Sequence, residues 1–181
     1  MKYIFITVYS IIFLACSGPR VLKTEFAEGT DISQYKTFDF YKLEASGDTM
    51  SRQFRDRSDN LQQAIAAELQ AKGYALSSQD PDLLVNIGIV VKDKVQTRQT
   101  DFRTDAPLYV GQRRYSWRSE EVVVGSYRMG TATVDLVDAA QNKMIWQGIV
   151  EGVIPDKEAR AEERLQKGMK ELFEDFPAKT R

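Results

Sequence analysis

Seven stretches of the chain have strand-like sequences, because they alternate apolar and polar residues or form short apolar runs bounded by turn residues. They cover residues 21–26, 35–41, 74–77, 83–99, 121–130, 131–138 and 143–154, and the stretch 74–77 is either a short strand or an extended link. Residues 83–91 are apolar on both sides of the alternation, which is typical of a central strand covered on both faces. From Lys92 onward the same stretch becomes polar, so we expect it to run out of the core.

Two further stretches repeat their apolar residues every three or four positions, as one face of a helix does. The first covers residues 51–72, and Gly73 is well placed at its C-cap. The second covers residues 156–176, with Pro155 ahead of it and Asp156 as its N-cap. Its expected buried stripe consists of Leu165, Met169, Leu172, Phe173 and Phe176. The order of strands and helices predicts an α+β fold, a mostly antiparallel sheet with two main helices packed on it.

The first residues of the chain have the layout of a signal peptide. Lys2 precedes an apolar run over residues 4–15, which is too short to cross a bilayer as a helix because about 20 apolar residues are needed. The run ends in the letters FLAC, residues 13–16, which resemble the lipobox of bacterial lipoproteins. This resemblance implies cleavage before Cys16, a diacylglycerol on its sulfur and acylation of the new amine. The alternatives are a secreted protein with an unmodified cysteine and a buried structural cysteine.

These features predict three parts of the chain. Residues 1–15 are the signal peptide, residues 16–20 are the lipidated Cys16 and a short tether, and residues 21–181 form a single domain. Ser17 follows the cysteine, whereas Asp at this position would resemble an inner-membrane retention signal. We therefore expect a cell-envelope protein whose lipid anchors it to the outer membrane, facing the periplasm.

Composition excludes several kinds of chemistry. The chain of 181 residues contains no histidine and a single cysteine. Ser-His-Asp and Cys-His nucleophile systems are therefore impossible, and so are zinc sites built on His or Cys. The 25 Lys and Arg residues nearly balance the 26 Asp and Glu residues, so no strong field attracts nucleic acid. We expect no cofactor, no metal, no nucleic-acid partner and no enzymatic activity.

Several short segments, taken in order and behind the lipobox, resemble one family. They read DISQYKTFDF, LQAKGY, DPDLLVNI, GTATVDLVD, MIWQGIVEG and FEDFP, and they are spread over residues 21–177. They are similar to the lipoproteins grouped as domain of unknown function 4136. The resemblance implies a lipid-anchored envelope protein with an α+β domain. It implies no activity, because none is generally assigned to the family.

The candidate binding surface is the segment YVGQRRYSWR, residues 109–118. Its aromatic and basic residues are Tyr109, Arg113, Arg114, Tyr115, Trp117 and Arg118. Arginine forms forked hydrogen bonds with carboxylates and phosphates and stacks on rings, and both residue types are enriched at recognition surfaces. The alternative is a hairpin whose rings pack on the sheet edge while its arginines are solvated.

Three other residues favour structural roles. Asp135 and Asp138 are three positions apart on a strand, so their carboxylates point to opposite faces and do not form a catalytic pair. We expect Asp138 to begin the turn that follows. Trp146 alternates with Met144 and Val150, which predicts a core position for it rather than a binding-site position.

Three functions remain compatible with these residues. The first is a non-enzymatic envelope protein whose periplasmic domain binds a protein partner or supports outer-membrane maintenance. The second is a small-molecule or glycan binding module, which a deep apolar pocket with convergent polar groups would favour. The third is a glycan hydrolase, which needs two carboxyl groups about 5–10 Å apart in a cleft.

Overall fold

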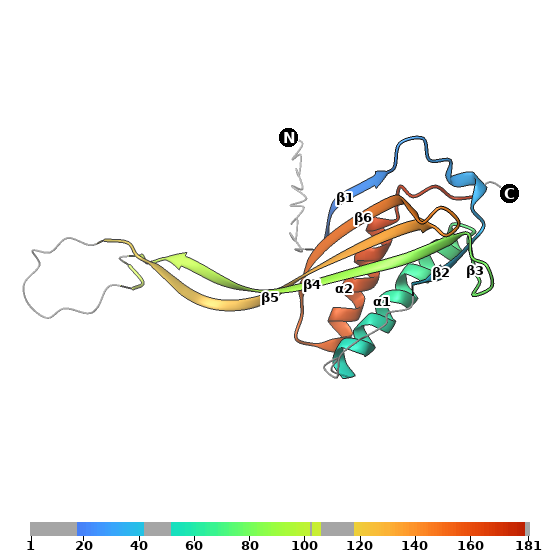
Figure 1. The fold of residues 1–181 in the computed structure, drawn as a ribbon. Coiled ribbons are helices and arrows are strands. Elements are labelled where there is room, and N and C mark those ends of the chain that lie inside the picture. Colours follow the sequence, from blue (N-terminus) through green and yellow to red (C-terminus); the bar gives the residue numbers. More distant parts are fainter. Residues whose placement is uncertain (1–17, 42–51, 102, 106–117, 180–181) are drawn as a thin grey trace, which may run out of the picture.

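The computed structural model describes residues 18–41, 52–101, 103–105 and 118–179. These residues form a six-stranded sheet with two helices on one of its faces (Figure 1). In chain order the elements are β1 (Arg20–Phe26), the 3₁₀ turn η1 (Ile32–Gln34), β2 (Thr37–Phe40), α1 (Arg52–Ala71), β3 (Ala75–Leu76), β4 (Leu83–Gln99), β5 (Glu121–Asp138), β6 (Lys143–Ile154) and α2 (Glu158–Leu172). The predicted α+β class is confirmed.

The strand order across the sheet is β1-β6-β5-β4-β2-β3. β1, β6, β5 and β4 pair antiparallel, whereas β2 is parallel to both β3 and β4. Parallel neighbours need a crossover connection, and α1 is part of that connection between β2 and β4. The crossover places α1 on the sheet face that α2 also covers (Figure 1).

The hydrophobic core lies between this sheet face and the two helices. Its most buried side chains are Phe38, Leu83, Val85, Val134, Leu136 and Trp146 from the sheet, Ile65 and Leu69 from α1, and Leu172 and Phe173 from α2 and its C-cap. The Trp146 ring centroid lies 5.1 Å from that of Phe173 and 5.2 Å from that of Phe176. The predicted core position of Trp146 is therefore confirmed, and so is the burial of Met169, Leu172, Phe173 and Phe176, whereas Leu165 is only partly buried. The second helix was predicted to extend to residue 176 but ends at Leu172, so Phe173 and Phe176 contribute to the core from beyond its end.

One prediction about β4 is wrong. Residues 83–91 were expected to be covered on both faces, but the helices cover one face only (Figure 1). Leu83 and Val85 point to the helices and are buried, while Val90 and Val91 are about half exposed. An unbroken apolar run does not distinguish a strand with two covered faces from a strand that leaves the core. The predicted polar continuation from Lys92 is confirmed, since every residue from there to Gln99 is exposed.

Three local predictions also need correction. Residues 121–130 and 131–138 form one continuous strand, β5, rather than two strands. The N-cap of α2 is Lys157, without a side-chain cap, in place of Asp156. Met144 is 46% exposed although it was expected to share the core face with Trp146, because the pairing register shifts between Leu136 and Val137 on the partner strand. The register shift places Ile145 in the core instead.

β4 and β5 continue far beyond the rest of the sheet as a two-stranded ribbon, which we call the arm, residues 92–99 and 121–127 (Figure 1). β6 pairs with β5 only as far as Arg128, and β2 pairs with β4 only over residues 83–85. Within the described chain the outer edges of the arm therefore have no strand partner. Val95 and Val123 of the arm are each 65% exposed.

Candidate functional site

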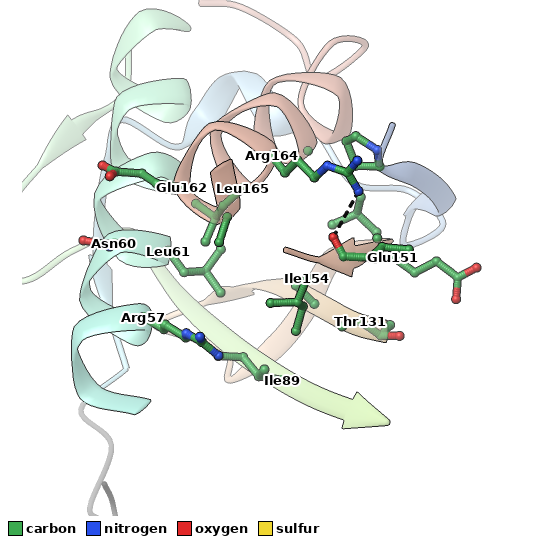
Figure 2. Close-up of a pocket in the computed structure, with 18 of the residues that line it drawn as sticks. Arg57, Asn60, Leu61, Ile89, Thr131, Glu151, Ile154, Glu162, Arg164 and Leu165 are labelled. Carbon is green, nitrogen blue, oxygen red and sulfur yellow. Dashed lines mark hydrogen bonds between the residues drawn. The ribbon is translucent and has the colours of Figure 1, made fainter. Parts of the chain in front are cut away.

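A pocket of about 300 Å³ lies between α1, α2 and the helix-covered face of β4, β5 and β6 (Figure 2). Most of its wall is apolar. The side chains that form this wall include Leu61 of α1, Ile89 of β4, Val150 and Ile154 of β6, and Leu165 and Met169 of α2. The pocket continues the core toward the end of the helices where the arm begins, and it is partly open to solvent.

Two glycines allow the wall of the pocket to pack closely. Gly130 of β5 and Gly168 of α2 both line the pocket. A Cβ atom at Gly130 would lie 2.9 Å from Cδ1 of Ile154, and one at Gly168 would lie 3.3 Å from Cβ of Pro19. Larger residues at these positions would therefore displace Ile154 or Pro19, which form part of the wall.

Two arginines line the pocket from opposite sides (Figure 2). Arg164 of α2 is held by the sheet, since its Nη1 donates to the carbonyl oxygen of Val153 at 3.3 Å. Arg57 of α1 extends toward Ile89 (Figure 2). Its Nε is buried and has no hydrogen-bond partner among the described residues. Arg57 is therefore a cationic donor with unused hydrogen-bonding capacity at the pocket wall.

Three glutamates also line the pocket. Glu151 is engaged elsewhere, because it forms an ion pair with Arg20 at 2.5 Å. Glu158 and Glu162 are exposed residues of α2. Figure 2 shows the carboxylate of Glu162 directed away from the pocket. The acidic groups therefore lie at the rim of the pocket, while the wall itself is apolar.

The two aspartates of the VDLVD segment are separated, as predicted. Asp135 accepts a hydrogen bond from Nε2 of Gln147 at 2.9 Å. Asp138 begins the β5–β6 turn, where its Oδ1 accepts from the backbone N–H groups of Ala140 and Gln141 at 2.9 and 2.8 Å. These backbone hydrogen bonds, together with one from a tyrosine hydroxyl, hold the pKa of Asp138 below its usual range. Asp138 is therefore a structural acceptor.

The carboxyl groups with shifted pKa values do not favour acid catalysis. The pKa values of Asp31, Asp82, Asp105 and Asp138 all lie below the usual range, because hydrogen bonds stabilise each ionised form. A glycosidase needs a carboxyl group whose pKa is raised so that it can donate a proton. Among the described residues no group of three or more His, Cys, Asp and Glu side chains gathers as a metal site would require.

Most of the predicted site residues lie outside the described residues. This applies to Cys16 and to Tyr109, Arg113, Arg114, Tyr115 and Trp117 of the predicted binding surface. Arg118 is described, and it is exposed just ahead of β5. The predicted lipid site and the predicted binding surface therefore stay predictions.

The pocket itself was not predicted from the sequence. One signal was present, because Arg57 and Leu61 are four residues apart in a helical pattern and so share a face. An arginine on the apolar face of a helix marks a position where a charge meets the core. The spacing does not tell whether packing closes over such a position or leaves space beside it.

Comparison with known proteins places this fold in a family. Residues 22–178 match the family described as "Domain of unknown function (DUF4136)". The chain belongs to the DUF4136 family. The family resemblance found in the sequence is thereby confirmed, and the matched residues include both helices, the sheet except for the first two residues of β1, and the pocket wall except for Pro19. No curated protein matches the chain.

Two solved structures resemble the DUF4136 domain. A PDZ domain protein from Parabacteroides distasonis matches with a TM-score of 0.55 and 16% sequence identity, over 91% of this chain and 37% of that chain. This chain therefore spans little more than a third of that protein, and the likeness concerns the fold alone. A PelC dodecamer from Paraburkholderia phytofirmans matches with a TM-score of 0.48 and 9% identity, over 90% of this chain and 99% of that chain.

Neither helix of the described part of the DUF4136 domain combines the length and the apolar character that crossing a bilayer requires.

Proposed function

We propose that this DUF4136 domain is a non-enzymatic binding module that holds a small, largely apolar molecule in the pocket between α1, α2 and the sheet. In this proposal a lipid on Cys16 anchors the domain to the outer membrane on its periplasmic side. The pocket is the observation that carries the proposal. Its volume of about 300 Å³ is at the lower end of the range for ligand pockets, roughly 300–1,000 Å³.

The composition of the wall also supports this function. Ligand pockets are mostly apolar and contain a few polar groups that orient the ligand. Here the apolar wall formed by Leu61, Ile89, Ile154 and Leu165 is combined with the guanidinium of Arg57. An apolar pocket with a few polar groups favours a small-molecule binding module over a protein that binds partners only through its outer surface.

Photoaffinity labelling of the membrane-bound, full-length protein tests the proposal. An uncharged alkyl probe that carries a diazirine is added to the membranes and activated, and the labelled residues are located by peptide mass spectrometry. We expect labels on the pocket wall, around Leu61, Ile154 and Leu165. Labels spread over exposed residues, with none on the wall, would contradict the proposal.

A matched pair of variants separates pocket filling from a general effect. Ala132→Leu adds volume inside the pocket, which Ala132 lines. Thr133→Leu adds the same side chain one position later, on the sheet face that the helices do not cover. Labelling is expected to fall in Ala132→Leu and to persist in Thr133→Leu, with circular dichroism confirming that both fold. Equal labelling of both folded variants would count against the pocket.

The arm supports a second candidate function, the binding of a protein partner. Its outer edges have no strand partner within the described chain, and an isolated two-stranded ribbon is only marginally stable in water. An extended segment of a partner protein that adds a strand to such an edge would satisfy its free N–H and C=O groups. A photocrosslinking residue at Val95 should then capture one protein in intact cells, whereas the same residue at exposed Lys170 of α2 should not. Identical products at both positions would refute arm-specific binding.

A further inference from the structure

We propose that the pocket selects a molecule with an oxyanion head group on a short alkyl chain, and that Arg57 binds the head group. This inference rests on the proposed function, since it names the chemistry of the ligand in the same pocket. It assigns the charge, the approximate size and the orientation of that ligand.

The hydrogen bonding of Arg57 is the first argument. Its Nε is buried and unpartnered among the described residues, although buried polar groups in folded proteins nearly always have a partner. Leaving a buried donor unpaired destabilises the protein, and more so when the donor is charged. A ligand oxyanion would supply the acceptor. The planar fork of a guanidinium matches the two oxygens of a carboxylate or a phosphate.

The other charged groups at the pocket are already engaged or lie at its rim. Arg164 donates to the Val153 carbonyl, and Glu151 pairs with Arg20. The carboxylate of Glu162 is directed away from the pocket (Figure 2). Of the two arginines that line the pocket, Arg57 is therefore the one with a buried donor atom that has no partner among the described residues, and it would repel a cationic head group.

The size of the pocket limits the alkyl chain. Its volume of about 300 Å³ is roughly twice the ~150 Å³ of an engineered apolar cavity that binds benzene. This ratio indicates a ligand with on the order of a dozen non-hydrogen atoms. Decanoate has this size. With its carboxylate at Arg57, its alkyl chain would contact Leu61, Ile154 and Leu165.

Competition against the diazirine probe tests this assignment in the membrane-bound, full-length protein. Decanoate, decyl phosphate, decanol and decylamine are the competitors, and each is titrated to the concentration that halves labelling of the pocket wall. We expect at least one of the two anions to compete at a lower concentration than decanol, and decylamine to compete least. The better of the two anions identifies the head group as a carboxylate or a phosphate.

Substitutions of Arg57 make the test independent of how each competitor partitions into the membrane. Arg57→Met keeps a long side chain without the charge, and we expect it to weaken competition by the anions about tenfold, as the loss of a charge-assisted hydrogen bond would. Its effect on decanol should be less than about twofold, because decanol has no charge for Arg57 to bind. Arg57→Lys keeps the charge without the planar fork, so competition by the anions should be weaker than in the wild type and stronger than in Arg57→Met. Arg160→Met removes an exposed arginine of α2 and should change nothing.

The possible outcomes separate the two proposals. Absence of pocket labelling by the uncharged probe in both the wild type and Cys16→Ser refutes the proposed function itself. Pocket labelling with equal competition by anions and decanol, in both the wild type and Arg57→Met, retains the pocket and overturns the oxyanion assignment. Labelling that appears only in Cys16→Ser would assign the pocket to the protein's own acyl chain, and this would also overturn it.

Discussion

At the scale of residues, two aspartates join distant parts of the chain at the end of the sheet opposite the arm. Oδ2 of Asp82 accepts hydrogen bonds from the backbone N–H groups of Lys36 and Thr37 at 2.7 and 2.9 Å. Oδ2 of Asp138 accepts from the buried hydroxyl of Tyr35 at 2.9 Å. Both carboxylates therefore hold the segment that enters β2 against the β4–β5 pair.

These contacts predict that acid weakens the fold. The pKa of Asp138 is lowered, chiefly by the Gln141 backbone N–H, and that of Asp82 chiefly by the Lys36 N–H. A carboxylate with a lowered folded-state pKa stabilises the protein fully above its unfolded pKa, here 3.8, and the contribution is lost as the pH falls through the folded value. The free energy of unfolding of the wild type should therefore drop as the pH decreases below about 4.

The variant Asp138→Asn tests how much of this pH dependence comes from the Asp138 carboxylate. The variant should be less stable by about 1–3 kcal/mol at pH 7, because the buried hydroxyl of Tyr35 loses a charged acceptor. Its urea-unfolding free energy should also depend less steeply on pH below 4 than that of the wild type. Asp156→Asn, at a carboxylate that is 99% exposed, is the matched control and should behave as the wild type does. An Asp138→Asn protein with the wild-type pH profile would contradict this assignment.

At the scale of elements, features that depend on local patterns could be predicted from the sequence, whereas features that depend on long-range packing could not. The bounds of β4 and β6 agree with the predicted strands at residues 83–99 and 143–154, because period-two alternation is a local property. The turn role of Asp138 was also predictable, since the N–H groups it accepts from lie two and three residues away. Its contact with Tyr35, 103 residues away, was not.

The candidate site depends on long-range packing in the same way. The pocket needs α1, α2 and three strands to meet with space between them, and no local pattern encodes that space. Val90 and Val91 of β4 were mistaken for core because they are apolar, although they are about half exposed. Periodicity reports which side chains share a face, while the neighbours of that face are set by the whole fold.

The arm is the element whose removal should matter least to the fold. Replacing residues 93–128 by an Asn-Gly turn joins Lys92 to Met129, which are paired across the strands. We expect the free energy of unfolding to change by less than about 1 kcal/mol, because the arm contributes no side chain to the core. Thermal and urea unfolding measure this. Phe173→Ala, which truncates a fully buried ring, should cost about 3–5 kcal/mol and calibrates the assay. Loss of cooperative unfolding without the arm would contradict the expectation.

At the scale of the whole molecule, the proposed anchor and the pocket are close along the chain. Cys16 precedes Pro19, which lines the pocket, by three residues. An extended chain of this length spans at most about 10 Å. An apolar ligand could therefore pass between the bilayer and the pocket over a short distance, if the lipid on Cys16 holds the domain at the membrane.

Mass spectrometry of the protein tests the proposed lipid anchor on Cys16. The protein extracted from membranes should begin at Cys16 and carry the added mass of a diacylglycerol and an N-linked acyl chain. Cys16→Ser should lack this mass and should not become acylated at the same site. Cys16 is the only cysteine of the chain, so no other thiol can take the lipid. An unmodified Cys16 in the membrane fraction would refute the anchor.

β4 passes from the core into solvent without a break. The amide hydrogens of this one strand should therefore exchange slowly in the core and fast in the arm. The amide of Val85 lies where β4 is flanked by β2 and β5, and its side chain is 1% exposed. The amide of Val95 lies in a ribbon with one neighbouring strand, beside a side chain that is 65% exposed. Amide hydrogens exchange with solvent through local openings whose free energy falls where buried contacts are few. Deuterium should therefore enter β4 from the arm inward, and the position where exchange slows marks the boundary of the cooperatively folded unit.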